Sequence, residues 1–180
     1  MTDRIVARPS SPRELRALAH PLRLRIIGEL RTNGPLTVGR LSDIFDEAPG
    51  SISYHLGMLV EFGYVSEVPE LAADRRERWW RAAHEMTRLA PDEASGGVRH
   101  QIVDIYAATL HRVIDAEPAT EQEWRAAATS SDVIAHLTPG QLAQASAELD
   151  ALLEKWADVG REATADSRPA QLIGHAFLRP

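Results

Sequence analysis

The chain has 180 residues, of which 44 % are hydrophobic and 26 % charged, with a formal net charge of −6 and no cysteine. Its length allows one domain or two small ones, and its composition is that of an ordinary soluble globular protein. The absence of cysteine excludes disulfides, thiolate metal sites and cysteine nucleophiles, and it fits a reducing compartment. No apolar run reaches the roughly 18 residues of a membrane helix. The N-terminus lacks an apolar signal core, so we expect a cytoplasmic protein with no membrane partner.

The two halves of the chain differ in charge. Residues 1–90 carry 13 arginines and 12 acidic residues, a balance of +1, whereas residues 91–180 carry 7 basic and 14 acidic residues, a balance of −7. The segment PDEASGG, residues 91–97, has the composition of a linker. We therefore predict two domains, residues 10–90 and 98–180, and expect the acidic second domain to dimerise or to bind an effector instead of binding DNA.

Helix signals begin at the segment SPREL. Ser11 can cap the free amides of a helix and Glu14 completes a capping box. This helix is expected to end near Ala19, because residue 20 precedes a proline and is biased away from helical torsions. A second helix is expected over residues 21–31, where apolar side chains recur at helical spacing.

Two further helices and a hairpin follow. Thr37 can cap a short helix through Phe45, and after the DEAPG break Pro49 suits the first turn of a helix that ends at Gly63. The segments YVSEVPE and ERWWRAA alternate as strands do, and the polar stretch LAADRR separates them. The first half of the chain is therefore expected to form four helices and a hairpin.

The second half is predicted to be largely helical. An amphipathic helix is expected over residues 98–116, and capping boxes begin at Thr120 and Thr138, the latter opening a helix to about Val159. Apolar residues of that last helix follow an a/d spacing, which suits either a dimer seam or ordinary core packing. The segments DVIAHLT (132–138) and QLIGHAFL (171–178) are predicted to be short pairing strands. The predicted fold class is mainly α (α+β), with a C-terminal helical domain that contains a small antiparallel sheet.

The segment GSISYHL begins a helix with two different faces. Ile52, Leu56 and Leu59 cluster on one side, and the opposite side carries small or hydrogen-bonding residues: Gly50, Ser53, Tyr54 and Gly57. Short polar side chains near a free helix N-terminus suit contact with phosphates and base edges, and a helix fits the DNA major groove. The preceding short helix and tight turn complete a helix-turn-helix, and the hairpin supplies a wing.

Four segments carry a family resemblance: LRALAHPLRLRIIGEL, LTVGRLSDIF, SISYHL and GYVSEV. Together they resemble the winged helix-turn-helix of the ArsR-type transcriptional repressors over about residues 11–82. The resemblance implies a homodimer that binds a two-fold, double-stranded DNA operator under the control of a small-molecule effector. The predicted DNA-binding residues are Thr37, Gly50, Ser51, Ser53, Tyr54, His55, Arg75 and Arg76. The alternative to DNA contact for His55 is a structural position beside the hydrophobic core.

One departure from the family pattern concerns charge. No lysine or arginine lies between Arg40 and Arg75, and phosphate neutralisation supplies much of the affinity for DNA. Binding would then depend strongly on salt, or on the wing and the N-terminal arginines. A winged-helix protein-interaction module without DNA binding is therefore the alternative function.

A second alternative is a metal-responsive repressor. His100, Asp104, His111 and Asp115 share one stripe of the helix expected over residues 98–116, with a spacing similar to that of metal sensors of this family. Val98, however, stands where that pattern has a carboxylate, and Asp and His are ordinary residues on the polar face of an acidic helix, so a solvated or interface face is the favoured interpretation of the stripe. We predict no metal and no cofactor. No catalytic motif is present, so we do not expect an enzyme.

Overall fold

The computed structural model describes residues 6–9, 11–73, 77–88, 96–162 and 164–179. The chain divides into two compact units, Met1–Glu121 and Gln122–Pro180. Among the described residues, no helix combines the length and the apolarity needed to cross a membrane. The division into units falls after the helix that follows the predicted linker, and the assignment of residues 98–180 to dimerisation or effector binding stays a prediction.

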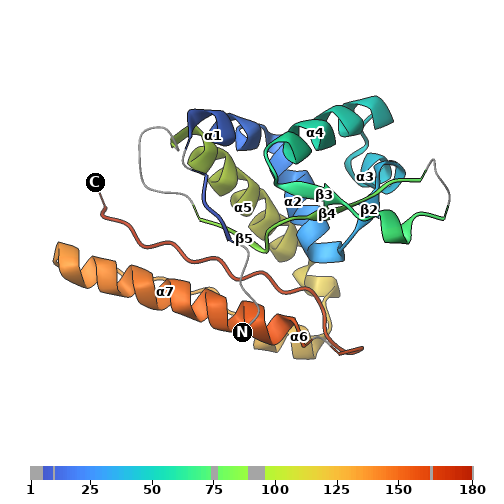
Figure 1. Ribbon diagram of the computed structural model, residues 1–180. Helices are drawn as coiled ribbons and strands as arrows, with labels where there is room; N and C mark the ends of the chain where they lie inside the picture. The colour runs from blue at the N-terminus through green and yellow to red at the C-terminus, as the bar shows by residue number, and fades with distance from the viewer. Residues whose placement is uncertain (1–5, 10, 74–76, 89–95, 163, 180) are drawn as a thin grey trace. The chain divides into compact units, whose positions relative to one another are not determined.

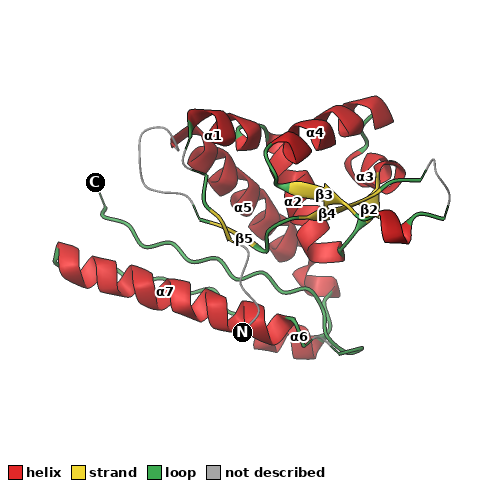
Figure 2. Cartoon of the chain, in the orientation of Figure 1, coloured by secondary structure: helices red, strands yellow, loops and turns green. Residues whose placement is uncertain are grey.

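The first unit is mainly helical (Figures 1 and 2). Its helices are α1 (Pro12–Leu18), α2 (Pro21–Asn33), α3 (Val38–Phe45), α4 (Pro49–Glu61) and α5 (Gly96–Ala116), with short 3-10 helices η1 (Pro69–Leu71) and η2 (Glu117–Ala119). The four helices predicted before the hairpin are confirmed. Gly63 adopts a φ of +71° just after α4, as its predicted role in ending that helix requires.

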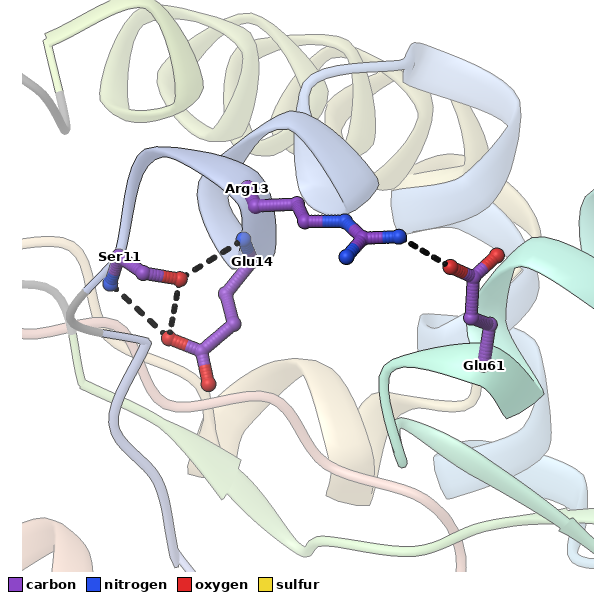
Figure 3. Close-up of polar contacts among 4 residues, drawn as sticks. All are labelled: Ser11, Arg13, Glu14 and Glu61. Carbon is purple, nitrogen blue, oxygen red and sulfur yellow. Dashed lines mark hydrogen bonds and ion pairs between the residues drawn. The ribbon is translucent and has the colours of Figure 1, made fainter.

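The capping box that predicted α1 is present (Figure 3). The amide of Glu14 donates to Ser11 Oγ over 3.2 Å, and the amide of Ser11 donates to Glu14 Oε2 over 2.9 Å. The neighbouring Arg13 forms an ion pair of 2.9 Å with Glu61, the last residue of α4. Because both of these side chains are largely exposed, the pair adds little to stability, whereas the capping box fixes where α1 begins.

A three-stranded antiparallel sheet forms the wing. Its order is β2 (Leu36–Thr37), β4 (Trp79–Ala82), β3 (Val65–Glu67), with Leu36 opposite Trp80 and Val65 opposite Ala82. Strands β3 and β4 are the two predicted strands. A separate parallel pair, β1 (Val6–Ala7) with β5 (Met86–Thr87), was not predicted, and neither was β2. The predicted fold class, mainly helical with a winged helix-turn-helix and a small antiparallel sheet, is confirmed.

One hydrophobic core joins the helices to the wing. Its largest fully buried side chains are Leu18, Ile26, Leu41, Ile52, Leu56 and Leu59. Helix α5 packs on α1 and α2, as Figure 1 shows, and contributes the buried Val98. The apolar back of α4 is thus fixed in the core, which leaves its opposite face outward.

Truncating a buried side chain on the apolar side of α4 should lower the stability of the domain. Leu56 is 1 % exposed, so Leu56→Ala is expected to lower the free energy of unfolding by about 2–5 kcal/mol through lost burial and a residual cavity. Urea denaturation followed by circular dichroism measures the loss. Val60→Ala on the same helix is the matched control, because Val60 is exposed, and we expect a change within about 0.5 kcal/mol. Equal losses in both variants would contradict this account of the core.

The second unit contains α6 (Gln122–Ala127) and α7 (Pro139–Gly160), and α7 begins with the predicted capping box of Thr138 and Gln141. The two strands predicted at 132–138 and 171–178 are wrong, since neither segment pairs as a strand. Gly174 instead lies against Leu149 and Leu153 of α7. An alternating apolar pattern fits an extended segment packed on a helix as well as it fits a paired strand. The antiparallel sheet is therefore the one in the wing.

Candidate nucleic-acid interface

Helix α3, the turn after it and α4 form a helix-turn-helix. Thr37 Oγ1 accepts a hydrogen bond from the amide of Arg40 over 3.3 Å and caps α3. Asp46 ends that helix in the left-handed region, with a φ of 53°, and Ser42 Oγ donates to the carbonyl of Glu47. These local bonds hold the turn tight, so the chain reverses within a few residues and begins α4.

Helix α4 presents the predicted polar face to solvent. Ser53, Gly57 and Gly50 are exposed, Ser51 is half-buried, and the Tyr54 side chain is 64 % exposed. The N-cap residue Ala48 provides no side-chain acceptor, so the first amides of α4 have no side-chain cap. Free amides and the helix dipole make this end favourable for an anion. The outward face of α4 therefore combines hydroxyl groups with an electropositive helix end.

His55 lies apart from that face. It is 8 % exposed, and its ring centroid lies 4.4 Å from that of His20, at the start of α2. Burial lowers the pKa of His55, His20 and Arg23 lower it further, and Glu47 opposes them. Of the two positions considered for this histidine, the structure places it beside the core, where its ring does not share the surface of Ser53 and Tyr54.

The tip of the wing, with the predicted Arg75 and Arg76, lies outside the described residues. At the tip end of β3 and β4, Arg78 donates to both carboxylate oxygens of Glu67, over 2.9 and 2.7 Å, and its guanidinium lies 4.5 Å from the Trp80 ring. The hydrogen bond with Arg78 lowers the pKa of Glu67. The charge of Arg78 is thus balanced within the wing.

A shallow groove of about 490 Å³ lies between the helix-turn-helix and the wing. Its lining residues are Thr37, Val38, Gly39, Ser53, Gly57, Val60, Glu77, Arg78 and Trp80. The groove brings together Thr37 and Ser53, two predicted DNA-binding residues from separate helices. It therefore joins the N-terminus of α3, the outward face of α4 and the wing in one surface.

Arg40 belongs to the same surface, although it is not among the residues predicted from the sequence. It is exposed on α3, one turn after Thr37, and its guanidinium lies 5.2 Å from the centre of the Trp79 ring in the wing. Its place in the first turn of the first helix of the motif was the signal available in the sequence. Arg40 adds a cation to a surface whose second helix has none.

The stripe proposed for metal binding does not form a ligand cluster. Within the described part of the chain, no group of three or more histidine, aspartate or glutamate side chains is placed to hold a metal ion. His100 Nδ1 lies 2.8 Å from the carbonyl of Gly96 in its own helix. The metal-responsive regulator therefore stays an alternative, and the absence of a metal stays a prediction.

The element order and the groove define a winged helix-turn-helix, and residues 18–63 match the family model of a helix-turn-helix domain. Three solved structures illustrate the similarity of the chain to other proteins. Reduced HlyU of Vibrio cholerae is 22 % identical, with a TM-score of 0.33, over 47 % of this chain and 77 % of that one. Rv0081 of M. tuberculosis is 24 % identical, with a TM-score of 0.34, over 57 % and 86 %. ZitR of Lactococcus lactis in complex with DNA is 14 % identical, with a TM-score of 0.30, over 82 % and 76 %. No curated protein matches the chain.

Proposed function

We propose that the protein is a cytoplasmic DNA-binding transcriptional regulator, a repressor that reads its operator as a homodimer through α4. The observation that carries the proposal is the groove that joins Thr37 of α3, Ser53 of α4 and the wing, beside the exposed Tyr54. A helix presented in this way, with its back in the core, has the shape that the major groove accepts. The resemblance of residues 11–82 to ArsR-type repressors supports the same function.

The contacts divide into two kinds. Thr37, Gly50 and Ser51 lie near helix N-termini, and with Arg40 they would hold phosphates and fix the register of the protein on the duplex. The hydroxyl groups of Ser53 and Tyr54 would contact base edges in the major groove. From the wing tip, Arg75 and Arg76 would reach the adjacent backbone or the minor groove. His55 is buried, so its proposed role is indirect.

An exposed apolar stripe on α5 supports the proposed homodimer. Val103, Ala107, Leu110 and Ile114 recur at intervals of four, three and four residues, and all four are exposed. This face is separate from the one through which Val98 packs in the core. Pairing with the same stripe of a second copy would bury both and would present two α4 helices to the half-sites of a two-fold operator. The unit Gln122–Pro180 is then the proposed site of a small-molecule effector.

Selection from random-sequence duplexes at two salt concentrations tests the proposal. Enrichment of a palindrome, with binding that weakens as salt rises, is the expected result, because phosphate contacts release counterions. Sedimentation of the enriched complex should give two chains per duplex.

The charge of the surface favours one rival, a winged-helix protein-interaction module. Helix α4 carries no lysine or arginine, and Arg78 is paired with Glu67. The selection separates the two functions, since the absence of any salt-sensitive retention of DNA would support the module and contradict the regulator.

A further inference from the structure

Two histidines connect the start of α2 to the recognition helix α4. His20 is the N-cap of α2, and its Nδ1 accepts a hydrogen bond from the amide of Leu22 over 3.2 Å. Its ring packs against that of His55 with the centroids 4.4 Å apart and the planes tilted by 41°. The His55 ring in turn meets Tyr54 edge-on at 5.2 Å. The junction of α1 and α2 is therefore in contact with the residue adjoining the exposed Tyr54.

This arrangement requires both imidazoles to be neutral. His20 Nδ1 can accept from the amide of Leu22 only while it carries no proton. His55 Nδ1 is buried and has no hydrogen-bond partner among the described residues, so a proton there would bring an uncompensated charge into the core. Two charged rings at 4.4 Å would also repel each other.

The groups around the pair add to this requirement. Arg23 of α2 is buried and donates to the carbonyls of Ala17 and Arg16 at the end of α1, which fixes its positive charge near both rings. The carboxylate of Glu47, in the turn before α4, opposes this effect, because it acts to raise the pKa of both histidines. The pKa of His20 is lowered mainly by burial and next by the charge of Arg23. The pKa of His55 is also lowered mainly by burial, and then by His20 and Arg23. Burial lowers the pKa of Arg23, and the phenol of Tyr54 acts against that lowering.

We propose that His20 and His55 are positioning residues that hold α4 in its DNA-binding orientation only while both rings are neutral, so that operator binding weakens on acidification. This inference rests on the proposed function as a DNA-binding regulator. It identifies the α1–α2 junction as a control point for the surface that carries Ser53 and Tyr54.

The direction of the effect distinguishes this mechanism from general electrostatics. Acidification adds positive charge to a protein and should strengthen its attraction to phosphates. Here the native rings bind protons less readily than they do in the unfolded chain, where the pKa of histidine is about 6.5. The unfolded state therefore takes up more protons as the pH falls. The neutral rings therefore make their full contribution to the stability of the junction above about pH 6.5. That contribution is lost as the pH falls through the pKa values that His20 and His55 have in the folded protein.

The test compares the wild type with His20→Asn, because asparagine keeps a side-chain acceptor at the N-cap that does not titrate. Fluorescence anisotropy on the selected operator, at constant ionic strength, should show wild-type affinity falling about tenfold between about pH 7.5 and about pH 5.5, as expected if one tenth of the protein stays binding-competent. His20→Asn should lose about threefold over the same range, because only the His55 ring still titrates. His55→Leu should lose about as much, because only the His20 ring then titrates. His100→Asn, which removes an exposed histidine of α5, should follow the wild type.

Two results with DNA would overturn the inference. One is wild-type binding that strengthens on acidification, and the other is an equal loss in the wild type and in His20→Asn. If no duplex binds at any pH, the proposed function fails, and the inference is decided by NMR of the free protein. The rings of His20 and His55 should then titrate below about 6.5, and the Tyr54 ring signals should shift with the same midpoint. Ordinary histidine titration, or an unmoved Tyr54, would overturn it.

Discussion

Ser53→Glu is expected to weaken operator binding by roughly 10- to 100-fold, the effect of losing one specific contact and adding repulsion from phosphates. Ser53 is exposed on α4 and lines the groove between the helix-turn-helix and the wing. A carboxylate at this position would lie close to the duplex on a surface that already has few cations. Fluorescence anisotropy on the selected operator at moderate salt measures the change in affinity.

The matched control for this variant is Ser131→Glu. Ser131 is exposed in the second unit, which contains none of the residues of α3, α4 or the wing, and the substitution adds the same negative charge to the chain. We expect its affinity to stay within about twofold of the wild type, because Ser131 belongs to none of the proposed contact elements and screening weakens repulsion by net charge at physiological salt. If the two variants lost affinity equally, net charge rather than the α4 surface would govern binding. That outcome would contradict the proposed contacts.

Arg31→Met is expected to lower the free energy of unfolding by about 3 kcal/mol, because two hydrogen bonds of a charged group are lost and their acceptors are left inside the protein. Arg31 Nε donates to the carbonyl of His84 over 2.8 Å, and its terminal nitrogen donates to Thr87 Oγ1 over 2.9 Å. Burial lowers the pKa of Arg31 to about 10, so the guanidinium stays charged at neutral pH. The side chain ties α2 to the segment that follows the wing.

Chemical denaturation of Arg31→Met beside Arg25→Met checks this account. Arg25 is exposed, with its guanidinium 4.7 Å from the centre of the Phe45 ring, and such contacts contribute about 0.5–1 kcal/mol. Hydrogen exchange of the amides of β4 and β5 should also rise in Arg31→Met and stay unchanged in Arg25→Met. Similar stabilities for the two variants would mean that the bonds to His84 and Thr87 contribute little.

The helix boundaries could be predicted because their signals are local. The capping boxes of Ser11 with Glu14 and of Thr138 with Gln141 each lie within four residues, and both are present in the structure. The apolar spacing of α4 likewise indicated which side is buried and which side carries Ser53 and Tyr54. The segments 132–138 and 171–178 show the limit of such signals, because alternation alone does not specify whether a strand has a partner.

The sequence by itself determined the helices, the helix-turn-helix and the exposed face of α4, since helical periodicity, proline and capping act over a few residues. Only the tertiary structure decided which distant residues meet. Arg31 donates hydrogen bonds to residues that lie 53 and 56 positions further along the chain. The ring of His20, at the start of α2, packs against the ring of His55 in α4. Such contacts depend on how whole helices pack in three dimensions, which no short stretch of sequence specifies. For that reason His55, a polar residue between the exposed Tyr54 and the buried Leu56 of α4, lies in the interior.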